Sequence, residues 1–540
     1  MAGATLGVTS ASAASVKTGG TVYTAMSWGT IADNFNPFVP AGSNAGGTLS
    51  VIYESLFYQN LVNGKLTPLL GTAYKWQDHN LQLVVTTRSG VKWSDGQPFS
   101  AQDVAFTFNY MKKYPALDLT GIWSMGLKSV AATSANGVVF TFAKANVPAF
   151  MYVAQQVIVP QHIWSKVAKP QTYTNTNPVG TGPFVLSKYT PYAVTYNRNP
   201  NYWMTGRPYI SSVVMEAVKS NDTALLYLLK HEIDFTYTAI TNPAKIYAAR
   251  NPAQNKYWWP VTNTNVLYMN TQESPFNLAV VRRAVAESLN MKLIADRAYF
   301  GAIATANEAN LVPGQVSQWY DPSLKSLEYH YNPALARQQL KSAGFKWSSS
   351  GQLEMPNGSV LPPYKILVGA GWTDFITMAQ VISSELQKIG ITTIIDQEPW
   401  DSYEGSLLSG RYDMAICWGA GQGPTPYYMY NQSLGSQYSA KVIGQTAVSD
   451  WARYTSPAID KALKSFASTS NLSVQKADMT AIERVVLGQV VLIPLTNRPN
   501  FFDYQTSRFA GWPTAQNPYN AGDPPDGAGA DLMYTQLYLK

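Results

Sequence analysis

Aromatic side chains next to glycines and turns are the residues of this chain best suited to chemistry, and that chemistry is ligand binding. An aromatic ring beside flexible backbone at the end of a strand lies where α/β folds bind their ligands. Flat rings also pack against the C–H faces of pyranose sugars, while amide and carboxylate side chains satisfy the hydroxyls. Any one such ring is more typical of a core, but several together indicate a cavity for a hydroxyl-rich ligand. The examples are Trp28-Gly29, Gly371-Trp372, Pro399-Trp400, Trp418-Gly419 and Pro426-Tyr427-Tyr428.

Side-chain type and position select ten candidate ligand-binding residues. Trp258 and Trp259 are adjacent, so in an extended segment they point to opposite faces and at most one of them can line a cavity. Trp93 and Trp203 are expected to lie in the core instead. The ten candidates are Trp28, Asn36, Trp258, Trp259, Asn270, Trp372, Trp400, Trp418, Gln422 and Tyr427.

The sequence lacks the motifs of metal-dependent and nucleophilic catalysis. With one cysteine, Cys417, and four scattered histidines, a cysteine-based zinc site and an internal disulfide are excluded. No Gly-x-Ser-x-Gly motif is present, and Pro424 follows the glycine-rich run 419–423 where a dinucleotide fingerprint needs its last glycine. We therefore expect no metal, no cofactor and no enzymatic activity, with Cys417 as a small buried residue. A secreted glycan hydrolase is the alternative of another class, because catalytic carboxylate pairs meet only in the fold.

Length and charge indicate several folded lobes and no nucleic-acid partner. At about 150 residues per domain, 540 residues predict three or four lobes. The 39 Lys+Arg and 32 Asp+Glu give 39 − 32 = +7, with no basic run. No stretch of 18 apolar residues is present, so no membrane-spanning segment is expected. Residues 1–18 are expected to be the tail of a truncated signal peptide, since Ala11-Ser12-Ala13 fits the small-x-small cleavage pattern; the protein is then secreted and extracytoplasmic.

Local patterns predict the elements that must position the candidate residues. Ser100, three residues before Asp103, is a capping box that opens a helix. Asn332-Pro333 predicts a second helix that closes at Gly344. Residues 366–368 predict a buried strand, the turn 369–371 a break, and the following stripe of apolar residues a helix ended by Gly390. With a further strand at 391–395, this strand–helix–strand unit predicts parallel α/β architecture.

The segment 88–111, RSGVKWSDGQPFSAQDVAFTFNYM, resembles the signature of the family 5 extracellular solute-binding proteins. These are the dipeptide- and oligopeptide-type receptors of ABC importers. Further matches run in order from about residue 20 to 500, so the resemblance covers nearly the whole chain. They include Gly180-Thr181-Gly182-Pro183-Phe184, Asn199-Pro200-Asn201-Tyr202-Trp203, Tyr268-Met269-Asn270, Arg411-Tyr412-Asp413-Met414 and Ile493-Pro494-Leu495.

The resemblance implies a two-lobe, hinged α/β fold like that of the periplasmic binding proteins (type II, cluster C), with an extra domain on the first lobe. It places lobe I at 19–50, 180–262 and 498–540, the extra domain at 51–179, and lobe II at 263–497. It also implies a monomer that delivers a small-molecule ligand to ABC transporter permease subunits, without nucleic acid.

The expected ligand class rests on one segment in which this sequence differs from the oligopeptide-binding members of the family. In the oligopeptide binders, the segment after a Gly-Trp pair carries an aspartate that pairs with the peptide's ammonium group. The matching segment here, 417–426, has no acidic residue, and burying an unpaired ammonium would be costly. It looks more like the cello-oligosaccharide branch, and Trp400 matches a tryptophan that lines the family's cavity. We expect a cello- or other β-linked gluco-oligosaccharide, with an oligopeptide as the alternative.

Overall fold

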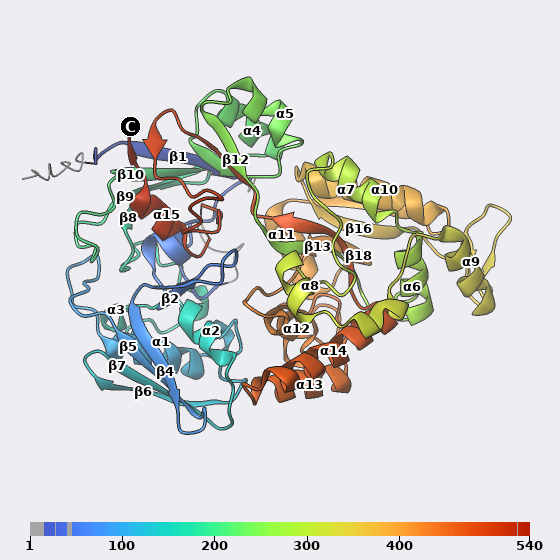
Figure 1. Ribbon diagram of the computed structural model, residues 1–540, viewed down its shortest axis with the longest axis horizontal. Coiled ribbons are helices and arrows are strands. Elements are labelled where there is room, and N and C mark those ends of the chain that lie inside the picture. The colour runs from blue at the N-terminus through green and yellow to red at the C-terminus, as the bar shows by residue number, and fades with distance from the viewer. Residues whose placement is uncertain (1–15, 27–28, 40–45, 526) are drawn as a thin grey trace, which may run out of the picture.

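The computed structural model describes residues 16–26, 29–39, 46–525 and 527–540. Two lobes lie side by side in Figure 1, and each is built on its own mixed sheet. The lobe at the left contains nearly the whole N-terminal half of the chain together with its C-terminus, and the lobe at the right contains most of the second half. The two-lobe α/β fold class predicted from the sequence is confirmed.

Lobe I is built on a seven-stranded sheet assembled from three distant parts of the chain. Its central strand β1 (Thr21–Met26) pairs in parallel with β10 and β11, and the C-terminal strand β20 pairs antiparallel with β11 and β12. The helices α4 (Asn221–Leu229), α5 (Pro243–Ile246) and α15 (Ala530–Gln536) accompany this sheet. The remaining strands are β8 (Phe184–Thr190), β9 (Ala193–Arg198), β10 (Ser212–Ala217), β11 (Phe235–Tyr237), β12 (Asn255–Trp258) and β20 (Phe502–Gln505).

Residues 71–142 form a separate antiparallel sheet below lobe I, within the segment expected to be an extra domain (Figure 1). The predicted helix is confirmed as α1 (Ala101–Lys113), with both hydrogen bonds of the Ser100–Asp103 capping box present. Trp93 is fully buried in this region, as expected. In sheet order the strands are β4 (Gly71–Gln77), β5 (Gln82–Thr87), β7 (Gly137–Phe142) and β6 (Leu127–Ser134), followed in the chain by α2 (Ala149–Gln155) and α3 (Gln161–Trp164).

Lobe II is built on a five-stranded sheet in the order β17-β16-β18-β13-β19. The predicted parallel unit is confirmed: β16 (Tyr364–Gly369) pairs in parallel with β17 (Thr393–Glu398), and α10 (Thr373–Gln387) joins them. β18 (Met414–Trp418) lies on the other side of β16, also parallel to it. β13 (Val261–Met269) and β19 (Ile493–Pro499) complete the sheet in antiparallel pairing.

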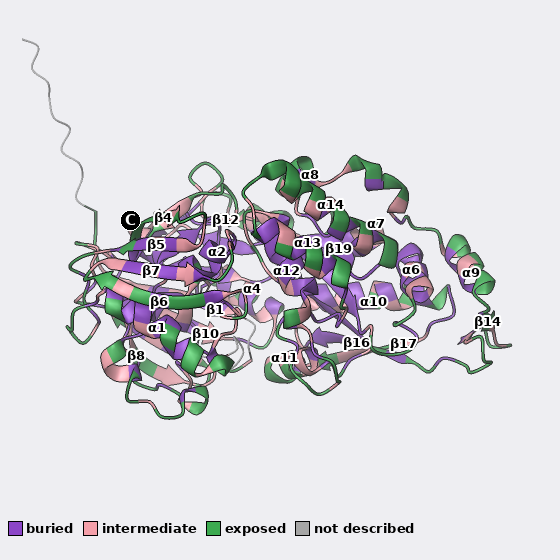
Figure 2. Ribbon diagram, turned by 90° about the horizontal axis from the view of Figure 1, so that it is seen from below, coloured by how far each residue is buried: buried purple, intermediate pink, exposed green. Residues whose placement is uncertain are grey.

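Helices cover both faces of this sheet, and Figure 2 shows them buried toward it and exposed away from it. The second predicted helix is confirmed as α9, capped by the Asn332 side chain. Besides α10, the helices of lobe II are, in chain order, α6 (Ala279–Ser288), α7 (Met291–Tyr299), α8 (Pro313–Trp319), α9 (Pro333–Ser342), α11 (Trp400–Ser409), α12 (Pro426–Leu434), α13 (Pro457–Ala467) and α14 (Leu472–Gln489). Among the described residues, no helix combines the length and apolar character needed to cross a membrane.

Two chain crossings connect the lobes. One runs from β12 into β13 around residues 258–261, and the other from β19 into β20 around 499–502. Both lie close to the ends of the segment 263–497 expected to form lobe II. Since the two crossings lie beside each other as β12 pairs with β20, they form a short two-segment connection at the back of the space between the lobes.

Candidate ligand-binding site

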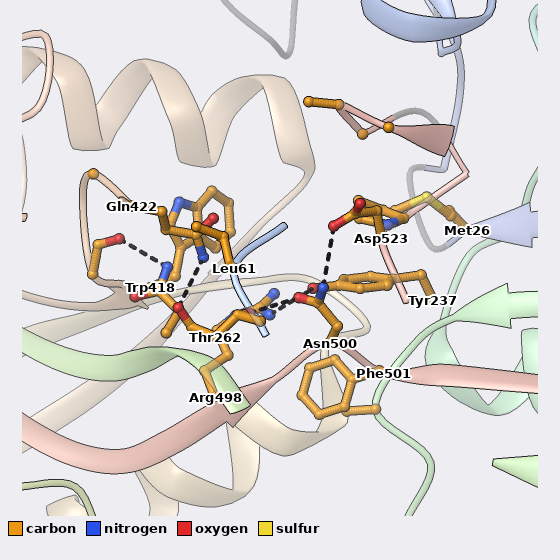
Figure 3. Close-up of a pocket in the computed structure, with 18 of the residues that line it drawn as sticks. Met26, Leu61, Tyr237, Thr262, Trp418, Gln422, Arg498, Asn500, Phe501 and Asp523 are labelled. Carbon is orange, nitrogen blue, oxygen red and sulfur yellow. Dashed lines mark hydrogen bonds between the residues drawn. The ribbon is translucent and has the colours of Figure 1, made fainter. Parts of the chain in front are cut away.

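A cavity of about 570 Å³ lies between the lobes, against the two crossings. Lobe I contributes Tyr237 and Thr238, the segment around Tyr58 contributes several side chains, and lobe II contributes three tryptophans. In Figure 3, Trp418 and Gln422 lie on one side of the cavity, Asp523 and Met26 on the other, and Asn500 between them. A volume of this size suits a small organic ligand enclosed between two lobes.

Trp372, Trp400 and Trp418 form one wall of the cavity, called here the tryptophan wall. Their ring centroids lie 5.5–6.1 Å apart with interplanar angles of 26–38°, so Trp400 and Trp418 are stacked and Trp372 is tilted against both. Each tryptophan lies at or just beyond the carboxyl end of β16, β17 or β18. These strands are parallel neighbours, and their carboxyl ends therefore meet at one edge of the sheet.

Asn500, on the second crossing, joins the polar groups at the back of the cavity. Its Oδ1 accepts hydrogen bonds from the hydroxyls of Tyr237 (3.0 Å) and Thr262 (2.8 Å). Its Nδ2 donates to the carbonyl of Ala521 (2.8 Å) and to Asp523 Oδ1 (3.3 Å). Because these partners come from both crossings and from the C-terminal segment, this network holds the back of the cavity together (Figure 3).

Two carboxyl groups line the described part of the cavity, and both already have protein partners. Asp374 accepts hydrogen bonds from the Tyr299 hydroxyl (3.1 Å) and Asn221 Nδ2 (3.4 Å), and burial raises its pKa. Asp523 accepts from the Tyr58 hydroxyl (2.6 Å) as well as from Asn500, and burial raises its pKa to about 7. Both carboxyl groups are therefore already engaged by neighbouring side chains, and Asp523 is only partly ionised at neutral pH.

Four of the ten candidate residues line the cavity: Trp372, Trp400, Trp418 and Gln422. Gln422 belongs to the glycine-rich segment after Trp418, and its Nε2 donates to the carbonyl of Thr262 at 3.4 Å. The segment contributes an amide to the cavity and no acidic group, as the sequence indicated.

Asn36 and Asn270 are placed away from the cavity, fully buried, and their amides are used by the fold. Asn36 Nδ2 donates to the carbonyls of Pro170 and Tyr173, and Asn270 Nδ2 donates to those of Gly410 and Tyr412. Because their amide donors bond to backbone within the core, we do not propose either residue as a ligand contact.

The remaining candidates also lie elsewhere. Trp258 packs beside Gly522, Trp259 donates from Nε1 to Asp503 (3.2 Å), and Tyr427 is buried and stacked on Phe466. Neither of the adjacent tryptophans lines the described cavity. Trp28 lies outside the described residues.

Sequence reasoning missed the polar and charged residues at the crossings. They do not lie in a recognisable motif, and for Thr262, Arg498 and Asn500 the available signal was their position near the expected lobe boundaries at about 262 and 498. The missed lining residues include Tyr237, Thr262, Arg498, Asn500, Phe501 and Asp523.

The described part of the chain gives little support for a metal site or for a reactive thiol. No group of three or more His, Cys, Asp or Glu residues there could hold a metal ion. Cys417 is buried behind Trp418, and burial raises the pKa of its thiol to about 12, so it is not a reactive thiolate at neutral pH.

Comparison with solved structures shows the same fold in proteins of low sequence identity. A mannohexaose-bound periplasmic oligopeptide-binding protein from Thermotoga maritima aligns with a TM-score of 0.90 at 24% identity, covering 96% of this chain and 98% of that one. The oligopeptide-binding protein AppA from Bacillus subtilis, in complex with a nonapeptide, aligns with a TM-score of 0.81 at 19% identity, covering 97% and 100%.

Sequence relatives and a family model are consistent with this structural similarity to extracellular binding proteins. The chain is 25% identical to the nickel-binding periplasmic protein of Escherichia coli over 83% of this chain and 84% of that protein. It is 25% identical to di/tripeptide-binding protein 2 of Pseudomonas aeruginosa over 90% and 91% of the two chains. Residues 65–441 match the model described as "Bacterial extracellular solute-binding proteins, family 5 Middle". The chain therefore belongs to the family 5 extracellular solute-binding proteins.

Proposed function

We propose that this protein is the secreted receptor of an ABC importer for an oligosaccharide, namely a cello- or other β-linked gluco-oligosaccharide. Proteins of this family bind small ligands outside the cytoplasm and deliver them to ABC permeases. The ligand is captured between the two lobes and passed, unaltered, to the permease.

The tryptophan wall is the observation that carries the proposal. Three clustered indole rings, with centroids 5.5–6.1 Å apart, offer flat apolar surfaces to a chain of sugar rings. A β-linked gluco-oligosaccharide suits such surfaces because its rings present extended apolar C–H faces. Gln422, Asn500 and Thr262 supply the amides and hydroxyls that sugar hydroxyls need as partners.

The charges of the cavity argue against a peptide ammonium as the anchoring group. The glycine-rich segment after Trp418 contributes no acid, and Asp374 and Asp523 are hydrogen-bonded to neighbouring side chains. Burial raises the pKa of both carboxyls, and the value of about 7 for Asp523 weakens that group as a partner for a cation at neutral pH. The mannohexaose bound to the Thermotoga maritima protein is further support, although similarity at that level concerns the fold.

Calorimetric titration and thermal unfolding with defined ligands test the proposal. We expect cellotriose to cellopentaose to bind and to raise the unfolding temperature, with about 2.7 kcal/mol of added stability at a hundredfold excess over Kd. Tri- to pentapeptides are expected to have no effect. Binding of peptides without binding of any sugar would instead establish the oligopeptide alternative.

Alanine variants of the tryptophan wall test the location of the site. Trp400→Ala and Trp418→Ala are each expected to weaken cello-oligosaccharide binding by about 1–3 kcal/mol while the protein stays folded. Tyr192→Ala is the matched control, since Tyr192 is 63% exposed and lies outside the described cavity lining. Chromatography of the recovered sugar separates a receptor from a hydrolase, because a receptor returns the chain length it was given.

A further inference from the structure

Arg498 is the one basic side chain among the described residues that line the cavity. It extends from the end of β19, beside the second crossing. Its guanidinium carbon lies 5.5 Å from the ring centroid of Trp418, 5.2 Å from Phe501 and 5.9 Å from Tyr237. The cation is therefore held by aromatic faces next to the end of the tryptophan wall (Figure 3).

The hydrogen-bond donors of Arg498 are largely unused. A guanidinium has five N–H donors in a planar fork. The single hydrogen bond seen runs from Nη1 to the Tyr237 hydroxyl at 3.4 Å, the long end of the range. Nε is buried and has no partner in the part of the chain that the structure describes. Within the same residues, no carboxylate lies within 4 Å of this guanidinium.

Two fully buried arginines of this protein bond to the backbone with both of their terminal nitrogens. Arg282 donates from Nε, Nη1 and Nη2 to the carbonyls of residues 276, 489 and 490. Arg453 donates from both terminal nitrogens to four backbone carbonyls, while its Nε, like that of Arg498, is buried without a partner among the described residues. The terminal nitrogens of the half-buried Arg498 make only one long hydrogen bond, so the contrast with Arg282 and Arg453 lies in these nitrogens and indicates that they can bond an acceptor that the protein chain does not supply.

The surrounding charges leave room for an anion at this position. Asp374 acts on Arg498 electrostatically, but it is bonded to Tyr299 and Asn221 and forms no direct ion pair with the guanidinium. Asp523 is bonded to Tyr58 and Asn500 and is only partly ionised near neutral pH. The unused guanidinium fork matches the geometry of a carboxylate, which accepts two parallel N–H bonds.

We propose that Arg498 is a specificity-determining residue and that the ligand is an acidic gluco-oligosaccharide, whose carboxylate pairs with Arg498 while its sugar rings pack on the tryptophan wall. This inference rests on the proposed oligosaccharide function and narrows it to sugars that carry a carboxyl group. A neutral sugar would leave the guanidinium with hydroxyl partners alone, which are weaker acceptors than a carboxylate.

Titration calorimetry with sugars matched in length tests the proposal. The probes are cellotetraose, the aldonic acid made by oxidising its reducing end, and a tetramer with a glucuronate at its non-reducing end. At least one acid is expected to bind about tenfold or more tightly than cellotetraose, and added salt is expected to reduce that advantage. Equal affinity for the neutral sugar and both acids would overturn the inference and leave the oligosaccharide function standing.

Variants then assign the preference to Arg498. Arg498→Met approximates the length of the side chain and is expected to bring the ratio of acid to neutral affinity close to one. Arg498→Lys keeps the positive charge and is expected to retain part of the preference for the acidic sugar. Arg337→Met is the matched control, since Arg337 stacks on Trp347 in lobe II outside the described cavity lining. A ratio unchanged in Arg498→Met would exclude this residue, and thermal unfolding verifies that each variant is folded. Binding of peptides but of none of the three sugars would overturn both proposals.

Discussion

Three buried carboxyl groups, Glu54, Asp531 and Asp523, interact electrostatically, and Asp523 also lines the cavity. Glu54 accepts hydrogen bonds from the Tyr202 hydroxyl (3.0 Å) and from Trp203 Nε1. Burial, together with the neighbouring Asp531, raises the pKa of Glu54 to about 8, and burial raises those of Asp531 and Asp523 to about 7. These groups therefore hold protons in the folded protein at pH values where the unfolded chain has lost them.

Stability is accordingly expected to fall as pH rises from about 5 to 8. Over this range the folded state binds more protons than the unfolded state, and the free energy of unfolding decreases with pH wherever that holds. Unfolding temperature measured across this range checks the prediction. Glu54→Gln keeps an acceptor for Tyr202 and should flatten the decline. A pH-independent profile, or an unchanged slope in Glu54→Gln, would contradict it.

At the scale of elements, the segment 419–423 determines how β18 presents its tryptophan to the cavity. It folds back against α12, and Gly421 has a positive φ of +80°. A Cβ at Gly421 would lie 2.4 Å from the carbonyl oxygen of Tyr428. Glycine is thus required there for two independent reasons, the backbone conformation and the close approach of α12.

Gly421→Ala is expected to displace this segment and to weaken ligand binding through Trp418 and Gln422. Gly301→Ala is the matched control, because Gly301 also has a positive φ (+76°), but a Cβ there would meet no atom within 4 Å. Both variants carry the strain of a left-handed residue, about 1–2 kcal/mol, so they should lose comparable stability from that cause. Calorimetry with cellotetraose should show a loss of affinity in Gly421→Ala alone; equal affinities would mean that the segment does not position the site.

Elements whose signals are local were predictable, and contacts between distant segments were not. The Ser100–Asp103 capping box and the parallel unit of β16 and β17 are sequence patterns that the structure confirms. The residues of the tryptophan wall could be predicted as ligand contacts because their aromatic rings lie at the ends of predicted strands. Asp523, by contrast, reaches Tyr58 across 465 residues of sequence, and no pattern near either residue announces that contact.

Asn36 and Asn270, two of the candidate ligand contacts, both form a local asparagine turn in the structure. Each side-chain oxygen accepts from the backbone N–H two residues later, at Phe38 and Gln272. This is the local turn that asparagine commonly forms, and it indicates a structural role in the backbone rather than a ligand contact.

At the scale of the whole molecule, the lobes touch on both sides of the cavity. On one side, the backbone N–H of Asn221 in lobe I donates to the carbonyl of Gly371 in lobe II at 3.3 Å. On the other, Tyr438 of lobe II donates from its hydroxyl to the carbonyl of Thr120, beside the antiparallel sheet of residues 71–142 (2.6 Å). The arrangement is that of two lobes closed on each other, with two crossings that can serve as a hinge.

Closure on the ligand should depend on Gly371, because a Cβ there would lie 2.4 Å from the carbonyl oxygen of Lys219 across the interface. In the wild-type protein, saturating cellotetraose is expected to reduce the radius of gyration measured by small-angle scattering, as the lobes rotate together. Gly371→Ala should bind more weakly and should show a smaller reduction, since the added methyl holds the lobes apart. Gly351→Ala separates this steric effect from backbone strain: Gly351 has a similar positive φ (+81°), but its surroundings are open. Normal affinity and normal compaction in Gly371→Ala would show that productive binding does not require the lobes to meet at this contact.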